Sequence, residues 1–153
     1  MLTHGADVKE TGELAYLLSR TYLERVPGFT RRLLGYMSFS PRYKSNLRQR
    51  AEASQKNPNP HGYIAFYVEG DGVNFDFGVD YHRCATLTFL QEQGAAGLAP
   101  YLCACDYLYS EMLGWGLTRT TTLAEGGDWC DFRFKRGRPT RIKSTVIDFE
   151  AIQ

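Results

Sequence analysis

Residues 63–80 read YIAFYVEGDGVNFDFGVD, and this segment decides the fold. Apolar and polar residues alternate on both sides of Gly70-Asp71-Gly72, as they do in two strands joined by a tight turn. We therefore predict a β-hairpin of Tyr63–Glu69 and Val73–Asp80. The alternation gives it an apolar face of Ile64, Phe66, Val68, Val73, Phe75, Phe77 and Val79. The opposite face then carries Tyr63, Tyr67, Asn74, Asp76, Asp80 and, if the alternation continues, His82.

Two helical segments precede this hairpin. Thr11 can cap the first, whose apolar residues recur at helical spacing as far as Pro27-Gly28. The second covers about residues 30–55 and is interrupted near Ser40-Pro41, because proline breaks a helix. The run Asn57-Pro58-Asn59-Pro60 then separates the helices from the first strand.

Two helices and up to three strands follow the hairpin. Gly94 and Gly114 are the expected stops of the helices, and Pro100 suits the first turn of the second one. The predicted helices are Arg83–Gln93 and Pro100–Leu113, and the predicted strands are Leu117–Leu123, Trp129–Lys135 and Thr140–Phe149.

This succession predicts the fold class. The order ααββααββ is typical of an α+β fold, with an antiparallel sheet of four or five strands and helices packed on one face. A length of 153 residues suits a single domain, which we place at residues 1–153.

Charge and hydropathy exclude several classes of partner. The formal net charge of +1 lacks the cationic excess of a non-specific nucleic-acid binder. The chain has no apolar run near the roughly 18 residues of a membrane span and no apolar signal-peptide core. We therefore expect no nucleic acid, no membrane and a cytoplasmic location. Thiols stay reduced there, so the cysteines are interpreted first as free, catalytic or metal-binding.

The helix Pro100–Leu113 gives its two cysteines different surroundings. At 100° per residue, Cys105 falls on the apolar stripe that faces the core, where a thiol is inert. Cys103 falls on the opposite side with Asp106 and Ser110. A thiol beside a carboxylate and a hydroxyl is a candidate catalytic group.

A second thiol, Cys84, lies in the first turn of the predicted helix Arg83–Gln93 and follows His82. The dipole of a first helical turn favours the thiolate, so Cys84 is a second candidate nucleophile and His82 a candidate proton carrier. The alternative is that Cys84 is a small buried hydrophobe.

The second hairpin carries further polar candidates. Thr120 and Thr122 could belong to a polar wall, or to an exposed β-branched edge. The amides of Gly126-Gly127 can bind an anion with Glu125 alongside, although a hairpin turn explains the glycines equally simply. An inward-facing Arg119 would suit a substrate carboxylate. Cys130 and Asp131 lie on opposite faces of the last strand of this hairpin.

Zinc is a weaker alternative. Cys84, Cys103 and Cys130 could hold it with His82 or a water molecule. The chain lacks the short C-x₂-C pairs of common zinc sites, so we expect no cofactor.

Three segments carry a family resemblance: PYLCACD, GLTRTTTLAEGGDWCDFRF and the RC pair before the 84–94 helix. Over about residues 81–136 they resemble the L-2-amino-thiazoline-4-carboxylic acid hydrolase family. The resemblance implies hydrolytic opening of a cyclic thiazoline amino acid to an N-carbamoyl cysteine. The positions that match by motif are Cys84, Cys103, Asp106, Arg119, Thr122, Glu125, Gly126, Cys130 and Asp131.

Two functions follow as hypotheses. The first is a small-molecule hydrolase, or a related ring-opening or ring-closing enzyme. In it Cys103 is the nucleophile, Asp106 or His82 the proton carrier, Arg119 the carboxylate clamp and the Gly126-Gly127 amides the oxyanion donors. The second is a non-catalytic domain that binds a small ligand in the same pocket. We leave a homodimer open as the assembly.

Overall fold

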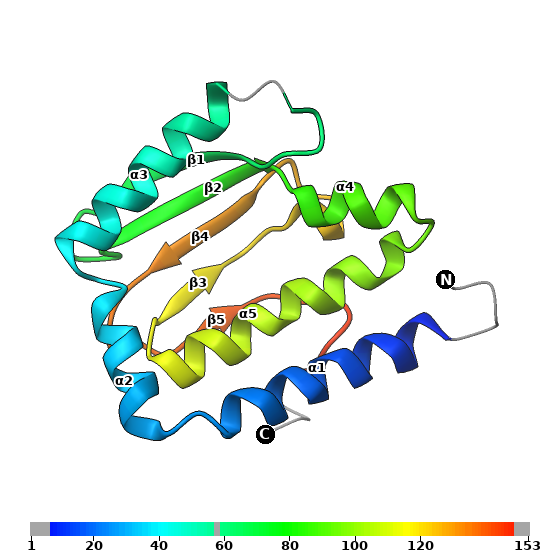
Figure 1. Cartoon of the computed structure of the whole chain (residues 1–153), viewed down its shortest axis with the longest axis horizontal. Helices are drawn as coiled ribbons and strands as arrows, with labels where there is room; N and C mark the ends of the chain where they lie inside the picture. The colour runs from blue at the N-terminus through cyan, green and yellow to red at the C-terminus, as the bar shows by residue number, and fades with distance from the viewer. Residues whose placement is uncertain (1–6, 57–58, 149–153) are drawn as a thin grey trace.

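In the residues that the structure describes, 7–56 and 59–148 of this computed structural model, five strands form one sheet in the order β1-β2-β4-β3-β5 (Figure 1). The pairs β1/β2, β2/β4 and β4/β3 are antiparallel, whereas β5 runs parallel to β3. The sheet is therefore mixed, which corrects the fully antiparallel sheet predicted above. The strands are β1 Ile64–Glu69, β2 Phe77–Arg83, β3 Leu117–Arg119, β4 Cys130–Phe134 and β5 Arg141–Ile142.

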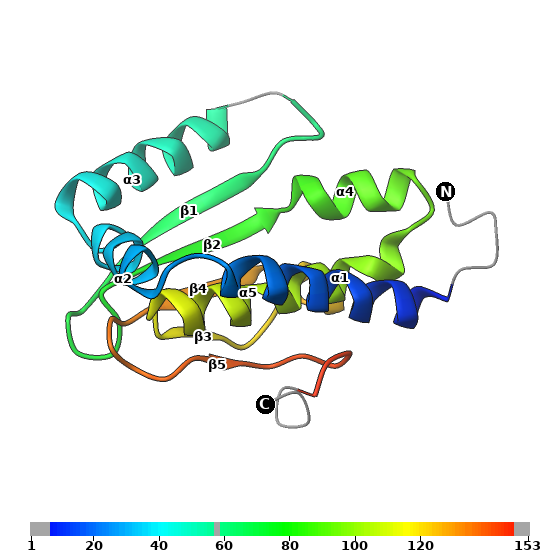
Figure 2. The same ribbon diagram turned by 60° about the horizontal axis from the view of Figure 1, so that its bottom comes forward.

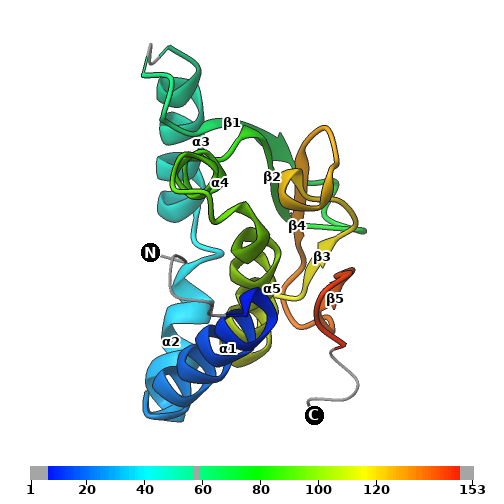
Figure 3. The same cartoon turned by 90° about the vertical axis from the view of Figure 1, so that its right-hand side faces the viewer.

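The helices lie on one side of this sheet, as predicted (Figure 3). The first helices are α1 Val8–Glu24, α2 Gly28–Met37 and α3 Pro41–Lys56, and the hairpin is followed by α4 Ala85–Glu92 and α5 Ala99–Leu113. Two short 3₁₀ helices, η1 Ala96–Leu98 and η2 Leu123–Glu125, complete the set.

The α+β class is confirmed, but the element order is αααββααβββ. Pro41 starts α3, so the segment predicted as one interrupted helix is two helices, and the chain turns between them. The final strand is shorter than Thr140–Phe149 and covers only Arg141–Ile142; Phe149, like Asn57-Pro58, lies outside the described residues. No described helix is both long enough and apolar enough to span a bilayer.

The side-by-side helices α1 and α5 share the main apolar core (Figure 2). The α1 residues Tyr16 and Leu23 pack there with Cys105 and Leu108 of α5. Gly12 makes the approach possible, because a Cβ at this position would lie 2.2 Å from the Tyr101 ring. Cys105 is buried in this cluster, as the helical period predicts.

The first hairpin forms, but its apolar face differs from the prediction. Phe66 lies opposite Asp80 and is exposed, whereas Tyr67 lies opposite Val79 on the buried side. The Asp71 carboxylate accepts hydrogen bonds from the amides of residues 73, 74 and 75, so the connection is wider than Gly70-Asp71-Gly72 and β2 begins only at Phe77. The change of face has another cause: residues paired across an antiparallel hairpin share a face, and Tyr67 pairs with Val79, so the inner face of β1 holds Ala65 and Tyr67 instead of Ile64 and Phe66.

The second hairpin is also shorter than predicted. Its first strand ends at Arg119, because Asp131 accepts hydrogen bonds from the amides of Thr120 and Thr121 at 2.8 and 2.7 Å. These bonds turn the backbone out of the sheet and lead it into η2. The chain between β3 and β4 therefore curls over one end of the sheet instead of extending the ladder (Figure 1).

Candidate functional site

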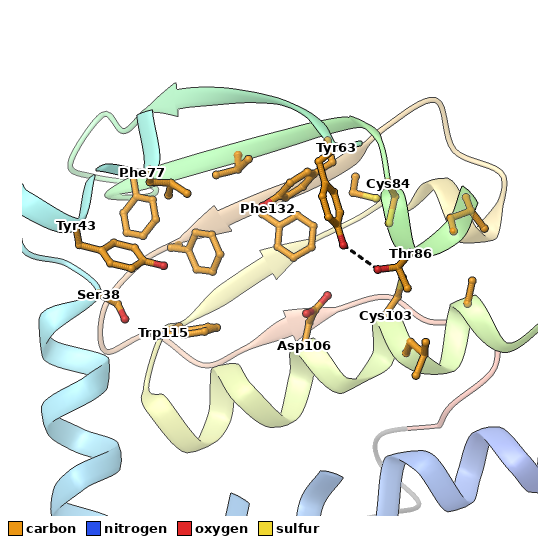
Figure 4. A pocket seen from close by; sticks show the side chains of 18 residues that line it. Ser38, Tyr43, Tyr63, Phe77, Cys84, Thr86, Cys103, Asp106, Trp115 and Phe132 are labelled. Carbon is orange, nitrogen blue, oxygen red and sulfur yellow. Dashed lines mark hydrogen bonds between the residues drawn. The ribbon is translucent and has the colours of Figure 1, made fainter. Parts of the chain in front are cut away.

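A cavity of about 360 Å³ lies between the sheet and the helices that cover it (Figure 4). Strands β2 and β4 form its floor, while α4 and α5 form the opposite wall. The walls are mainly aromatic and aliphatic: Tyr43, Leu47, Tyr63, Phe77, Val79, Tyr81, Leu87, Ala99, Leu102, Trp115, Phe132 and Phe134. The remaining lining residues are Ser38, Cys84, Thr86, Cys103, Asp106 and Cys130.

Four of the predicted site residues meet in this cavity: Cys84, Cys103, Asp106 and Cys130. Cys103 and Asp106 are one turn apart on α5 and so share the face toward the sheet. Cys84 is the residue before α4, and Cys130 is the first residue of β4. Two helices and a strand therefore bring residues distant in sequence to one cavity.

Asp106 is held from behind by a buried cation. Arg119 Nη1 donates to Asp106 Oδ2 at 2.5 Å and to the carbonyl oxygen of Cys103 at 2.9 Å. The Arg119 side chain is only 1% exposed, and its guanidinium lies 5.5 Å from the Phe132 ring centre. Arg119 does not line the cavity, and its geometry suits orientation of Asp106. Its role as a substrate clamp stays a prediction.

Burial makes Asp106 titratable near neutrality. Burial raises the pKa of its carboxyl to about 6, although the Arg119 guanidinium acts in the opposite direction. A carboxyl with this pKa can exchange protons in either direction at physiological pH. The Asp106 carboxyl lines the cavity, and the Arg119 contact fixes its orientation there.

The thiols are less reactive than the sequence suggests. Burial raises the pKa of Cys103 to about 12 and outweighs the nearby Arg119 guanidinium. Burial also raises the pKa of Cys130, whose sulfur accepts a hydrogen bond from the Leu123 amide at 3.3 Å. Both groups are therefore neutral thiols at physiological pH, which argues against a thiolate nucleophile at Cys103.

His82 lies away from the cavity. It is on the sheet face opposite Tyr81, where it stacks on Trp129 at 6.0 Å and meets Phe66 edge-on at 4.9 Å. His82 therefore does not line the cavity with Cys84 and Cys103, and its role as proton carrier stays a prediction. Among the described residues, no three His, Cys, Asp or Glu side chains are arranged to hold a metal ion, so the zinc set considered above is not formed.

The predicted polar residues around η2 stabilise the local chain. Thr122 is buried and caps η2, and Glu125 accepts hydrogen bonds from the amide and hydroxyl of Thr145. Burial acts to raise the pKa of Glu125, but these hydrogen bonds outweigh it and lower that pKa. The Gly126 and Gly127 amides donate to the carbonyls of Leu123 and Thr122, and their role as oxyanion donors stays a prediction.

Thr120 and Asp131 also have structural partners. The Thr120 hydroxyl donates to Asp131 at 2.7 Å, in addition to the amide contacts described above. Thr120, Thr122 and Glu125 border a second, open hollow beside β5. Of the residues predicted to bind substrate, Cys130 thus lines the cavity, whereas Thr120 and Thr122 lie at the turn around η2.

The aromatic cavity wall was not assigned from the sequence. Tyr63 and Thr86 meet across it, with their hydroxyl oxygens 2.8 Å apart (Figure 4). The signals were the many Tyr and Phe residues and the period-two runs Phe77-Val79-Tyr81 and Phe132-Phe134. These runs indicate a strand face, but they do not tell whether that face meets solvent, core or a cavity.

Fold and cavity together define a small α+β protein with an apolar small-molecule site and one titratable carboxylate. Residues 24–134 match the model of the family described as L-2-amino-thiazoline-4-carboxylic acid hydrolase. This match covers more than half of the chain, and the protein therefore belongs to that family. The matched region begins well before Tyr81 and so includes α2, α3 and the first hairpin. Comparison with curated proteins and with solved structures finds no match.

Proposed function

We propose that the protein hydrolyses a small cyclic molecule at a C–N or C–S bond, with Asp106 as general acid and base. The family gives the reaction class, and the substrate would be thiazoline-like. One observation carries the choice of residue. Asp106 faces the cavity, has a pKa of about 6 and is oriented by the buried guanidinium of Arg119.

Ring opening would proceed in two proton transfers. The ionised Asp106 takes a proton from water while the water oxygen bonds to the C=N carbon and the π electrons move to nitrogen. The electron pair on nitrogen then re-forms the C=N bond as the bond between carbon and the ring sulfur breaks, and the protonated Asp106 gives its proton to that sulfur. The hydroxyl-bearing isourea that results tautomerises to the carbamoyl form, so one water is added overall and Asp106 is ionised again. Arg119 keeps the second carboxylate oxygen in place throughout, and Cys103 remains a neutral neighbour.

A second candidate function is binding without turnover. The predominantly aromatic wall favours it, because such a wall can hold a ligand without any chemistry. The two functions differ in whether a ring-opened product accumulates and whether Asp106 is needed for it.

Asp106→Asn tests the proposal. We expect ring opening of 2-amino-thiazolines, followed by mass spectrometry as the gain of one water, to fall by about 10²–10⁴-fold. Asp128→Asn is the matched control, because Asp128 is exposed and lies outside the cavity. Circular dichroism and ligand binding establish that both variants fold. Turnover by Asp106→Asn equal to that of the control contradicts the mechanism, and binding without turnover in the parent protein favours the second function.

Assembly and location remain proposals as well. We propose a homodimer that uses the outer face of α1, where Leu14, Leu17, Leu18 and Tyr22 are all exposed. We also propose the cytoplasm, because all four cysteines, each within the described residues, are free thiols.

A further inference from the structure

We infer that the substrate carries no carboxylate: it has a nitrogen-containing head that donates hydrogen bonds to Asp106 and an uncharged, bulky apolar body in the aromatic end of the cavity. This inference rests on the proposed hydrolase function and names its substrate class. It departs from the compound in the family's name, which is a carboxylic acid.

The first argument is charge. Among the described residues that line the cavity there is no Lys, Arg or His, and Asp106 is the one charged group. Arg119 is behind Asp106 and does not line the cavity: its Nη1 donates to that carboxylate and to the Cys103 carbonyl, and its Nε is buried away from the ligand space without a partner in the described part of the chain. A bound carboxylate would lose its water, gain no cation and face a second carboxylate, and burying an unpaired charge is strongly unfavourable.

Two cations on or beside β4 are also engaged elsewhere. Arg133 of β4 forms a two-point ion pair with Asp80, at 2.6 and 3.2 Å. Lys135 donates to Asp76 at 2.7 Å. Neither cation lines the cavity, so neither supplies the missing charge.

The second argument is the asymmetry of the cavity. Figure 4 shows Tyr43, Phe77 and Trp115 at one end, Cys84, Cys103 and Thr86 at the other, and Asp106 between them. The aromatic end is tightly packed, and the Phe134 ring lies 4.9 Å from Phe77 and 5.9 Å from Trp115. Such preformed aromatic walls favour flat apolar groups.

The third argument is size. At the roughly 30 Å³ that one water molecule occupies in the liquid, a cavity of about 360 Å³ has room for about twelve groups of that size. A 2-amino-thiazoline with a carboxylate has about nine non-hydrogen atoms, so by this count it leaves room for a few further groups. A ligand with an additional ring would fill both regions and keep its head at Asp106.

Three related compounds test the inference in the intact protein: 2-amino-thiazoline-4-carboxylate, its methyl ester and its anilide. We expect titration calorimetry to give the order anilide, ester, acid, with the acid at least about tenfold weaker than the ester because its charge is buried without a partner. Acid binding as tight as ester binding, or binding of none of the three, overturns the inference.

Leu102→Lys supplies the missing cation. Leu102 lines the cavity and is 39% exposed, so a lysine there can reach the ligand without disturbing the core. We expect the ratio of acid to ester affinity to rise about tenfold in this variant. Tyr109→Lys is the matched control, because Tyr109 is 38% exposed on the same helix and does not line the cavity. An equal rise in the control, or no rise in Leu102→Lys, counts against the inference.

Binding and turnover separate this inference from the proposed function. If the neutral compounds bind tightest and none is opened, the substrate class stands as a ligand class and the hydrolase proposal fails. If the acid binds tightest and is opened in an Asp106-dependent reaction, the hydrolase proposal stands and the inference about charge is wrong.

Discussion

Asp106 connects the helical period of α5 with the chemistry of the cavity. Its place beside Cys103 could be predicted, because the two residues are one turn apart and the apolar stripe of the helix identifies the other face. The partnership with Arg119 could not be predicted in detail. Arg119 is the last residue of β3, and its position depends on where that strand ends. The strand ends where Asp131 accepts hydrogen bonds from the amides of Thr120 and Thr121, and no repeating sequence pattern predicts those contacts.

The pH dependence of turnover should report on Asp106. Its carboxyl acts first as a base and is ionised above a pKa of about 6, so we expect kcat/KM to rise with pH through about 6 and then level off. The measurement is a pH–rate profile of the parent protein between pH 4.5 and 8, values chosen to span about two units around this pKa. The residual activity of Asp106→Asn should lack the inflection. The same inflection in the variant would assign the titration to another group.

The thiols should be dispensable for turnover. Cys103 has a pKa of about 12 and is protonated at neutral pH, so we expect Cys103→Ser, alone or with Cys84→Ser, to change kcat by less than about fivefold. Steady-state kinetics of the single and double variants check this. Loss of turnover by two orders of magnitude in a folded Cys103→Ser protein would restore the nucleophile predicted from the sequence.

At the scale of elements, the sequence predicts which segments are strands better than it predicts how they pair. The alternation of residues 63–80 correctly indicates a hairpin. In the observed register, however, Tyr67, rather than Phe66, joins Val79 on the inner side. Residues paired across an antiparallel hairpin share a face, so the pairing of Tyr67 with Val79 fixes the inner side of β1. Within β2, alternation alone puts Tyr81 on the inner side with Phe77 and Val79, and His82 on the other side, as predicted.

Close packing of α2 against α5 gives a stability prediction at this scale. A Cβ at Gly35 would lie 1.8 Å from the Leu113 carbonyl oxygen, which is backbone and cannot move aside cheaply. We expect Gly35→Ala to lower the free energy of unfolding by about 2–4 kcal/mol, within the range of overpacking and backbone shifts. Chemical denaturation followed by circular dichroism measures this change.

Gly28→Ala is the control for this prediction. Gly28 is the first residue of α2, and the nearest atom to its Cβ would be the end of the Arg31 side chain at 3.9 Å. Alanine should be neutral or slightly stabilising there, because it favours the helix more than glycine does. Equal stability of the two variants would show that α2 and α5 can separate without cost.

For the whole molecule, the succession of predicted helices and strands indicates the fold class, while the cavity arises from the way the layers meet. The helices and the sheet are both apolar where they face each other, yet they leave a hollow above β2 and β4. The spacing of apolar residues in the sequence does not predict such a hollow, because a fully packed core would give the same spacing. The single domain of residues 1–153 remains a prediction, supported by one sheet whose helices lie on one side.

The outer face of α1 leads to the prediction of a homodimer. This helix buries Tyr16 and Leu23 against α5, yet its opposite side carries Leu14, Leu17, Leu18 and Tyr22, all exposed. A surface helix that is apolar on both sides needs a second partner. Helix α1 carries both acidic and basic residues, for example the Arg20–Glu24 pair at 2.9 Å. In a symmetric dimer with its two-fold axis at α1, a basic residue of one copy can therefore face an acidic residue of the other.

The neighbouring segment is less suited to self-association. Residues 25–50 carry only basic charges, at Arg25, Arg31, Arg32, Arg42, Lys44, Arg48 and Arg50. An axis through that segment would bring like charges together, which disfavours association. The balance of charge thus selects α1 rather than α2 or α3 as the centre of the interface.

Leu18→Glu tests the interface. Leu18 is 61% exposed in the single chain, so a glutamate there should leave the fold intact and convert a dimer into a monomer, because a symmetric interface would bury the new charge twice. Sedimentation velocity over a range of protein concentrations measures the change. Phe89→Glu on α4 is the matched control, since Phe89 is similarly exposed at 59% but lies outside α1. A monomeric parent protein, or equal dissociation in both variants, would contradict an interface on α1.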